Sequence, residues 1–325
     1  MPGPRTRRGP RLLAGGVVAL SLLPVGCGSD RDSTPAPVAV ALDFTPNAAH
    51  APLYMAVHDR ADRRQGIRIR IRRPASQPDA LKLLSAGRID VGILDIHDLG
   101  LARERGADLV GIGALVQRPL AALIAQPSIR RPRHLAGRTV GVSGLPSDPA
   151  FLRAIVEHDG GRYDRIRQVT IGFEAVSALL TGRVQAVPAF WNAEGVALRR
   201  RGRRVNVFRV EDYGAPRYPE VVFITTRRLL RVHRDRIRRF LAAVRVGIGA
   251  TLRRPAVAAE QIARANETRD TRLIRAQLRA VASALSPPLE LDRGILRRWA
   301  AFDASIGILR RRPDVNRAFD FGLVR

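Results

Sequence analysis

From residue 37 onward, short apolar runs alternate with segments of helical periodicity, and this alternation constrains the fold more than any other feature of the chain. The first apolar run, residues 38–42, precedes a helical segment that begins near Pro52. Strands that alternate with helices form βαβ units, in which the sheet is mostly parallel. The sequence therefore predicts an α/β protein that contains several such units.

The alternation is interrupted by a segment of strand and helix breakers, residues 127–132. Before this segment, apolar runs predict strands at residues 38–42, 66–71, 90–94, 109–115 and 120–125. After it, they predict strands at residues 138–142, 169–171, 186–190 and 205–208, and a return strand at residues 218–225. From residue 226 the pattern is helical, with helices predicted at residues 227–253, 255–266, 271–285 and 293–308. The long runs at 109–115 and 120–125 are suited to cross between two lobes.

These segments predict two α/β lobes with parallel-rich sheets, joined by extended crossings. We assign residues 37–127 and 226–325 to the first lobe, which includes a C-terminal helical tail, and residues 128–225 to the second. This organisation resembles that of a two-lobed (type II) periplasmic binding protein. The resemblance implies that a ligand binds in the cleft and that the lobes close over it by a hinge motion.

Residues 1–27 resemble the signal peptide of a bacterial lipoprotein. Four arginines precede an apolar run, residues 12–25, that is shorter than the roughly 20 residues of a membrane span. The run ends in Leu-Pro-Val-Gly-Cys, which resembles a lipoprotein box and implies that Cys27 is lipidated. The alternative is an ordinary signal peptide in which Cys27 is incidental. Because residues 28–36 are typical of a flexible tether, we expect an extracytoplasmic protein anchored to the outer face of the cell membrane by lipid at Cys27.

The formal net charge of +27 would by itself suggest a nucleic-acid partner. However, Lys82 is the only lysine, and the arginines are spread along the chain without an interleaved aromatic platform. We therefore expect solvated arginine-rich surfaces and no nucleic acid, with attraction to anionic lipid headgroups as the next possibility. Because Cys27 is the only cysteine, the chain has no internal disulfide and no thiolate metal site. We expect no metal and no cofactor.

Residues 42–50, Leu-Asp-Phe-Thr-Pro-Asn-Ala-Ala-His, join the first predicted strand to the first helix. They resemble the N-terminal motif of the thiamine-precursor family, whose members bind or make the aminopyrimidine half of thiamine. Stretches farther along the chain resemble the same family in the same order: residues 114–120, 141–148, 190–196 and 219–222. The resemblance implies a solute-binding lipoprotein of an ABC importer, with a small-molecule solute and a membrane permease as its partners.

Candidate binding residues follow several predicted strands, at the edge where open α/β sheets bind their ligands. Phe44 and Trp191 follow strands of opposite lobes, so closure would bring both rings to one planar solute. Relatives generally carry tryptophan where Phe44 stands. Asn47 and His50 could contact the edges of the solute's ring. Alternatively, Asn47 only caps the next helix and His50 is structural.

The resemblance implies that Glu194 accepts hydrogen bonds from an exocyclic amine and a ring nitrogen, a two-point contact that one carboxylate can make. Asn192 is a further candidate ligand contact. The alternative is that Glu194 complements a helix N-terminus, with Asn192 as the cap. Asp95 stands where pyrimidine binders carry Ser-Tyr-like residues, and a carboxylate there favours a solute with a donor or a positive charge unless Asp95 is a helix cap. Ser143 and Gly144 form a turn whose N–H groups offer an anion site.

Together these features predict a monomeric solute-binding protein that delivers a small heteroaromatic, such as a thiamine-precursor pyrimidine, and catalyses no reaction. Tyr213 and Glu220 are candidate rim residues. One alternative is a binder of an alkanesulfonate or another nitrogen or sulfur compound, against which Glu194 and Asp95 argue. Another is a pyrimidine synthase of the same family. Those synthases carry a cysteine cluster near the active site, whereas the only cysteine here is in the leader.

Overall fold

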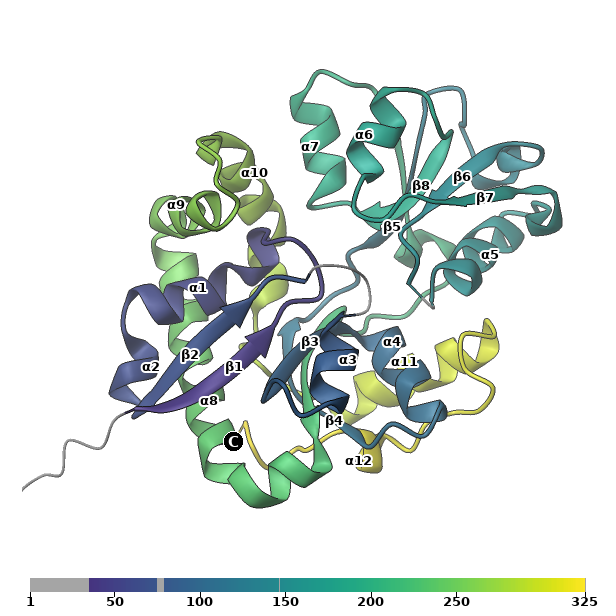
Figure 1. The fold of residues 1–325 in the computed structure, drawn as a ribbon. Coiled ribbons are helices and arrows are strands. Elements are labelled where there is room, and N and C mark those ends of the chain that lie inside the picture. The colour runs from purple at the N-terminus through teal and green to yellow at the C-terminus, as the bar shows by residue number, and fades with distance from the viewer. Residues whose placement is uncertain (1–34, 75–78, 146, 325) are drawn as a thin grey trace, which may run out of the picture. The chain divides into compact units, whose positions relative to one another are not determined.

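Two mixed β-sheets, each with five strands, form the framework of the protein. The computed structural model describes residues 35–74, 79–145 and 147–324, which belong to one compact unit (Figure 1). The predicted signal peptide with Cys27, and residues 28–34 of the predicted tether, lie outside the described residues.

The first sheet has the strand order β2-β1-β3-β10-β4. Its strands are β1 (Ala36–Ala41), β2 (Ile67–Arg72), β3 (Val91–Asp95), β4 (Leu109–Val116) and β10 (Val221–Thr226). β1 pairs in parallel with β2 and β3, whereas β10 is antiparallel to both β3 and β4.

The second sheet repeats this plan, with the order β7-β6-β8-β5-β9. Its strands are β5 (Ala121–Ala125), β6 (Thr139–Val142), β7 (Arg167–Thr170), β8 (Ala186–Phe190) and β9 (Asn206–Arg209). β6 is parallel to β7 and β8, and β5 is antiparallel to β8 and β9. Each sheet therefore contains one strand that is antiparallel to its neighbours. It is β10 in the first sheet and β5 in the second, in each case the first strand after the chain has crossed from the other lobe.

This pairing differs from the predicted lobe ranges in two places. Residues 121–125 were assigned to the first lobe but form β5 of the second sheet, and residues 221–225 were assigned to the second lobe but form β10 of the first sheet. The outward crossing lies between Val116 and Ala121, and the return crossing lies between Arg209 and Val221. Both crossings are thus one strand away from the predicted boundaries.

The strand sequences explain how the sheets are covered. β2 alternates isoleucine with arginine, and its arginines are exposed while Ile67 and Ile69 are buried, as expected for an edge strand with one face on the core. All residues of β4 are buried. Isolated bridges to Leu289 and Phe319 cover the outer edge of β4. This edge strand therefore does not require the alternation of apolar and polar residues that β2 shows.

Helices cover both faces of each sheet (Figure 1). The helices of the first lobe before the outward crossing are η1 (Ala48–His50), α1 (Ala51–His58), α2 (Ala61–Arg64), α3 (Asp79–Ser85) and α4 (Ile96–Glu104). The second lobe and the return crossing contain η2 (Pro132–Leu135), α5 (Asp148–His158), η3 (Tyr163–Arg165), α6 (Ala175–Leu180), α7 (Glu194–Arg200) and η4 (Val210–Tyr213). The helical tail consists of α8 (Arg227–Arg253), α9 (Pro255–Ala265), α10 (Thr271–Val281), η5 (Ala282–Leu285), α11 (Arg293–Ser305) and α12 (Val315–Ala318).

The tail packs against the first lobe, as predicted, and α8 lies against α1. The approach is so close that a Cβ atom at Gly247 would stand 2.0 Å from the carbonyl oxygen of Pro52. Only glycine permits this contact, because real Cβ atoms do not come within 3 Å of a neighbouring atom. α10 also contacts α7 of the second lobe, where Gln277 Nε2 donates to the carbonyl of Ala193.

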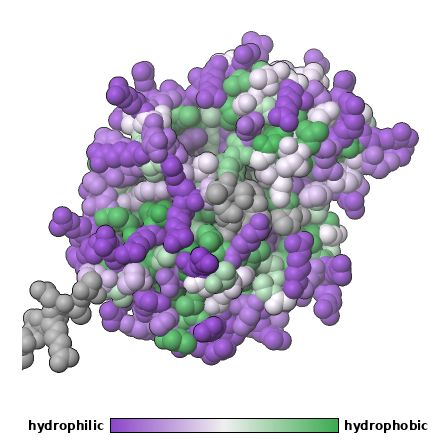
Figure 2. All heavy atoms as spheres, viewed as in Figure 1, coloured by the Kyte–Doolittle hydropathy of each residue, from purple (hydrophilic) through white to green (hydrophobic). Residues whose placement is uncertain are grey.

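Hydrophilic residues make up most of the outline of the face drawn in Figure 2, and apolar residues appear between them in small groups. Large exposed apolar side chains on the described residues are Val232, Val246 and Leu252, all on α8. Among the described residues, no helix combines the length and the apolar character needed to cross a membrane.

Candidate functional site

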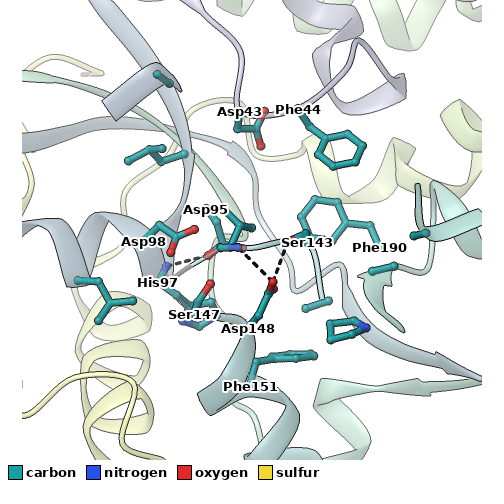
Figure 3. Close-up of a pocket in the computed structure, with 18 of the residues that line it drawn as sticks. Asp43, Phe44, Asp95, His97, Asp98, Ser143, Ser147, Asp148, Phe151 and Phe190 are labelled. Carbon is teal, nitrogen blue, oxygen red and sulfur yellow. Dashed lines mark hydrogen bonds between the residues drawn. The ribbon is translucent and has the colours of Figure 1, made fainter. Parts of the chain in front are cut away.

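A pocket lies between the two lobes, at the ends of strands from both sheets (Figure 3). Its cavity volume is about 120 Å³, which is close to the roughly 150 Å³ of an engineered cavity that admits one benzene ring. Phe44 enters from the first lobe, and Phe151 and Phe190 enter from the second. The pocket therefore suits a solute built on a single ring.

The loop after β1 is held by a local hydrogen-bond network. The backbone N–H of Asn47 donates to Nδ1 of His50 (3.1 Å), and the Asn47 side chain accepts from the N–H of Ala49 (2.9 Å). Nδ1 of His50 is therefore the acceptor, and Nε2–H donates to Asp43 Oδ1 at 2.7 Å. Asn47 and Asp43 line the pocket, but His50 is 1% exposed and lies behind it. This arrangement agrees with the alternative that His50 has a structural role. Asn47 both caps η1 and lines the pocket.

The aromatic pair expected from the sequence is not the one that meets in the structure. Trp191 lies outside the pocket lining: its indole N–H donates to the carbonyl of Pro119 (3.2 Å), and the guanidinium of Arg209 covers its ring at 4.1 Å. Phe44 instead forms an edge-to-face pair with Phe173 of the second lobe, with ring centroids 4.4 Å apart. Phe190, one residue before Trp191, lines the pocket.

The turn predicted to bind an anion is already occupied by a side chain of the protein. Asp148 Oδ2 accepts from Ser143 Oγ (2.9 Å), Gly144 N (2.9 Å) and Leu145 N (3.1 Å). Burial raises the pKa of Asp148, and these three donors partly offset the rise. Ser143 lines the pocket but Gly144 does not. The N–H groups that would hold an anionic solute are therefore used within the second lobe.

Glu194, a predicted ligand contact, begins α7 and lines the pocket. Its Oε2 accepts from the backbone N–H of Phe190 at 3.0 Å, and burial raises the pKa of its carboxyl group. Glu194 thus presents its carboxyl group to the pocket. Asn192, predicted as a ligand contact or alternatively as a cap, is 1% exposed, lies outside the lining and makes no side-chain hydrogen bond with the described residues.

Asp95 ends β3, lines the pocket and caps α4 by accepting from the N–H of His97 (2.8 Å). Burial raises its pKa well above the ordinary value, and the neighbouring carboxyl group of Glu220 adds to the rise. Glu220, on the return crossing, accepts through Oε2 from the N–H groups of Leu120 (2.6 Å) and Ala121 (3.2 Å) on the outward crossing. The proposed rim residues are thus placed differently: Glu220 is fully buried behind Asp95, and Tyr213 lies outside the lining.

His97 extends this buried cluster toward the tail. Its Nδ1 lies 2.8 Å from both carboxylate oxygens of Asp303, on α11. Burial lowers the pKa of His97, but the carboxylates of Asp303 and Asp95 outweigh this effect and raise it to about 10. His97 is therefore a cation at neutral pH, and its Nδ1–H donates to Asp303.

Asp95, His97 and Glu220 are also the described residues with the best geometry for a metal ion, because one ligand atom of each lies within 4.8 Å of the others. Histidine and carboxylate ligands of this kind suit zinc and related divalent ions. Each of the three side chains nevertheless has a hydrogen-bond partner within the protein: the N–H of His97 for Asp95, Asp303 for His97 and the N–H of Leu120 for Glu220.

Sequence reasoning missed several residues of the pocket wall: His97, Asp98, Asp148, Phe151 and Phe190. His97 and Asp98 closely follow the candidate Asp95, and Asp148 and Phe190 lie within the family-like stretches 141–148 and 190–196. Phe151 has only the signal of an aromatic residue on an amphipathic helix, which is typical of core.

Comparison with known proteins identifies the family. Residues 47–258 match the family model described as NMT1/THI5 like. The formylaminopyrimidine-binding protein of Halalkalibacterium halodurans is 32% identical over 191 residues, which cover 58% of each chain. The 4-amino-5-hydroxymethyl-2-methylpyrimidine phosphate synthase of Aspergillus parasiticus is 24% identical over 226 residues, covering 65% of this chain and 66% of the synthase. The matches thus span less than two thirds of the length of these relatives.

Solved structures show the fold. The alkanesulfonate-binding protein SsuA from Xanthomonas axonopodis pv. citri superposes with a TM-score of 0.70 at 19% identity, over 88% of this chain and 98% of that one. The Candida albicans CA3427 gene product, described as having the generic periplasmic binding protein fold, superposes with a TM-score of 0.68 at 16% identity, over 88% of this chain and 96% of that one. The predicted two-lobed α/β periplasmic-binding-protein fold is confirmed, and the chain belongs to the NMT1/THI5-like family.

Proposed function

We propose that this protein binds a small nitrogen heteroaromatic solute, of the thiamine-precursor pyrimidine type, between its lobes and delivers it to an ABC permease. The observation that carries the proposal is a ring-sized pocket that combines phenylalanine rings from both lobes with the carboxyl group of Glu194. A planar heterocycle requires apolar faces and a few edge-on hydrogen-bonding groups, and this lining supplies both. The name of the formylaminopyrimidine-binding relative agrees with this choice.

The positions of the candidate reactive residues, His50 and Cys27, support binding without catalysis. His50, the residue that a synthase of this family would suggest, is held between the Asn47 N–H and Asp43 and does not line the pocket. Cys27 is the only cysteine and belongs to the predicted leader. Lipidation of Cys27, residence on the outer face of the membrane and a monomeric state are part of the same proposal.

A second candidate is a binder of alkanesulfonates, favoured by Arg105 at the exposed edge of the lining and by the fold shared with SsuA. It is the weaker candidate because carboxyl groups outnumber basic groups in the lining, and they would repel a sulfonate. The turn at Ser143, which could have bound an anion, is already used by Asp148.

Calorimetric titration of the mature protein separates these candidates. We expect 4-amino-5-hydroxymethyl-2-methylpyrimidine to bind and to raise the melting temperature, because a ligand present at about 100 times its Kd stabilises the folded state by about 2.7 kcal/mol. Glu194→Gln should weaken binding, whereas Glu157→Gln, an exposed change on α5, should not. Binding of methanesulfonate in place of the pyrimidine would refute the proposal, and unaltered binding by Glu194→Gln would remove Glu194 from the site.

A further inference from the structure

The pocket is acidic although the chain is strongly basic. The chain has 56 basic and 29 acidic residues, yet the lining contains carboxyl groups from Asp43, Asp95, Asp98, Asp148 and Glu194. Arg105 is exposed at the edge of the lining, and the charge of His97 is paired with Asp303. The composition of the chain therefore does not account for this concentration of acids.

Most of these carboxyl groups have partners within the protein. Asp43 accepts from His50, Asp148 from the turn at Ser143, Glu194 from Phe190 and Asp95 from His97. Each of these interactions explains the position of the side chain without a ligand.

Asp98 is different. It lies in the first turn of α4, it is 6% exposed, and neither of its oxygens accepts a hydrogen bond with acceptable geometry from a described residue. Burial and the neighbouring carboxyl groups of Asp95 and Asp148 raise the pKa of Asp98, and the charge of His97 and the Ser147 hydroxyl partly offset this rise. A buried carboxylate without partners is costly, so such groups in folded proteins usually mark a missing ligand, water or ion. Figure 3 shows Asp98 on the pocket wall beside Asp95 and His97.

We propose that the solute is a heteroaromatic cation whose positively charged nitrogen group binds Asp98, with Asp95 beside it, while its ring lies among Phe44 and Phe190. This inference rests on the proposed function and specifies the charge of the solute. The first lobe would supply Asp98 and Asp95, and the second lobe Glu194 and Phe190, so that one solute contacts both lobes. A charged N–H donor and a carboxylate form a stronger hydrogen bond than a neutral pair. The site can therefore discriminate between a cationic solute and a neutral one of similar shape.

A matched pair of probes isolates the charge. The pyrimidine 4-amino-5-aminomethyl-2-methylpyrimidine carries an ammonium group at neutral pH where 4-amino-5-hydroxymethyl-2-methylpyrimidine carries a hydroxyl group. We expect the wild type to bind the aminomethyl probe at least about tenfold more tightly. Asp98→Asn, which is nearly isosteric, should abolish this preference. Asp212→Asn, an exposed change on η4, serves as the control and should retain the preference.

The outcomes separate this inference from the proposed function. Equal affinity of the wild type for both probes would refute the proposal that the solute is a cation, but not the proposal that the pocket binds a pyrimidine. A preference that persists in Asp98→Asn, with an unchanged melting temperature, would overturn the role of Asp98. Stabilisation by Zn²⁺ alone that exceeds stabilisation by the aminomethyl probe would assign the acidic wall to a metal and overturn the inference. Binding of neither probe, with binding of methanesulfonate, would overturn both proposals.

Discussion

Glu220 joins the two crossings between the lobes, and its replacement tests how the pocket is held together. The side chain comes from the return crossing and accepts from the N–H groups of Leu120 and Ala121 on the outward crossing, at 2.6 and 3.2 Å. It is fully buried, and burial raises the pKa of its carboxyl group. Asp95, on the pocket wall, is also its neighbour, with one carboxyl oxygen of each residue within 4.8 Å of the other.

The cost of Glu220→Ala follows from these contacts. Leu120 N is a buried donor and Ala121 N is partly buried, and the change leaves both without an acceptor. An unsatisfied buried donor costs about 1–3 kcal/mol, so the free energy of unfolding should fall by about 2–6 kcal/mol. A domain of ordinary stability has only about 5–15 kcal/mol in total, so the loss is a large fraction of it.

Glu220→Gln keeps an acceptor for the two N–H groups, and its amide can donate to Asp95. We therefore expect it to lose no more than about 1 kcal/mol. Urea denaturation of the mature protein measures both changes, with the exposed Glu157→Ala as a control that should stay within about 0.5 kcal/mol of the wild type. A loss below about 1 kcal/mol for Glu220→Ala, or equal losses for the alanine and glutamine variants, would refute the account of the crossings.

Three further predictions concern packing, pH and the anchor. Gly247→Ala should destabilise the protein by about 1–3 kcal/mol or more in urea denaturation, because the added methyl group overlaps the carbonyl of Pro52, whereas Gly249→Ala meets only the flexible end of an arginine and should be tolerated. Burial raises the pKa of Asp98 well above its ordinary value, so its contribution to stability is present below about pH 4 and is lost as the pH rises through the folded-state pKa. Asp98→Asn should therefore make the free energy of unfolding fall less steeply with rising pH, and an unchanged slope would contradict this. Labelled palmitate should enter the wild type but not Cys27→Ser in a bacterial host, and equal labelling would exclude Cys27 as the anchor.

The parts of the fold that the sequence predicted are those determined by local patterns. The alternation in β2 and the helical periodicity after residue 226 depend on neighbours within a few residues, and the predicted elements were found there. The sheet to which β5 and β10 belong was predicted wrongly, because an apolar strand has the same pattern in either sheet. Pairing is decided by partners far along the chain, such as β8 for β5 and β3 for β10.

The aromatic wall of the pocket shows that the sequence could not distinguish between two adjacent residues as the ligand contact. Phe190 and Trp191 are neighbours at the end of β8, and successive side chains on an extended backbone point to opposite sides. The sequence favoured the larger ring, whereas the structure turns Phe190 to the pocket and Trp191 toward Pro119 and Arg209. Nothing in the local pattern distinguishes these two orientations, because both residues are apolar enough to be half buried.

The polar residues of the site show why candidate positions were easier to predict than their roles. A polar side chain after a strand is a candidate ligand contact, but its role depends on whether the protein already satisfies its hydrogen bonds. His50 and Gly144 were candidates by position, and both have partners within their own loops. Asp98 has no such partner among the described residues, and Glu194, whose Oε2 accepts from Phe190, lines the pocket from the opposite lobe. A solute that satisfies both would stabilise the closed arrangement of the lobes, so specificity and closure should depend on the same two carboxyl groups.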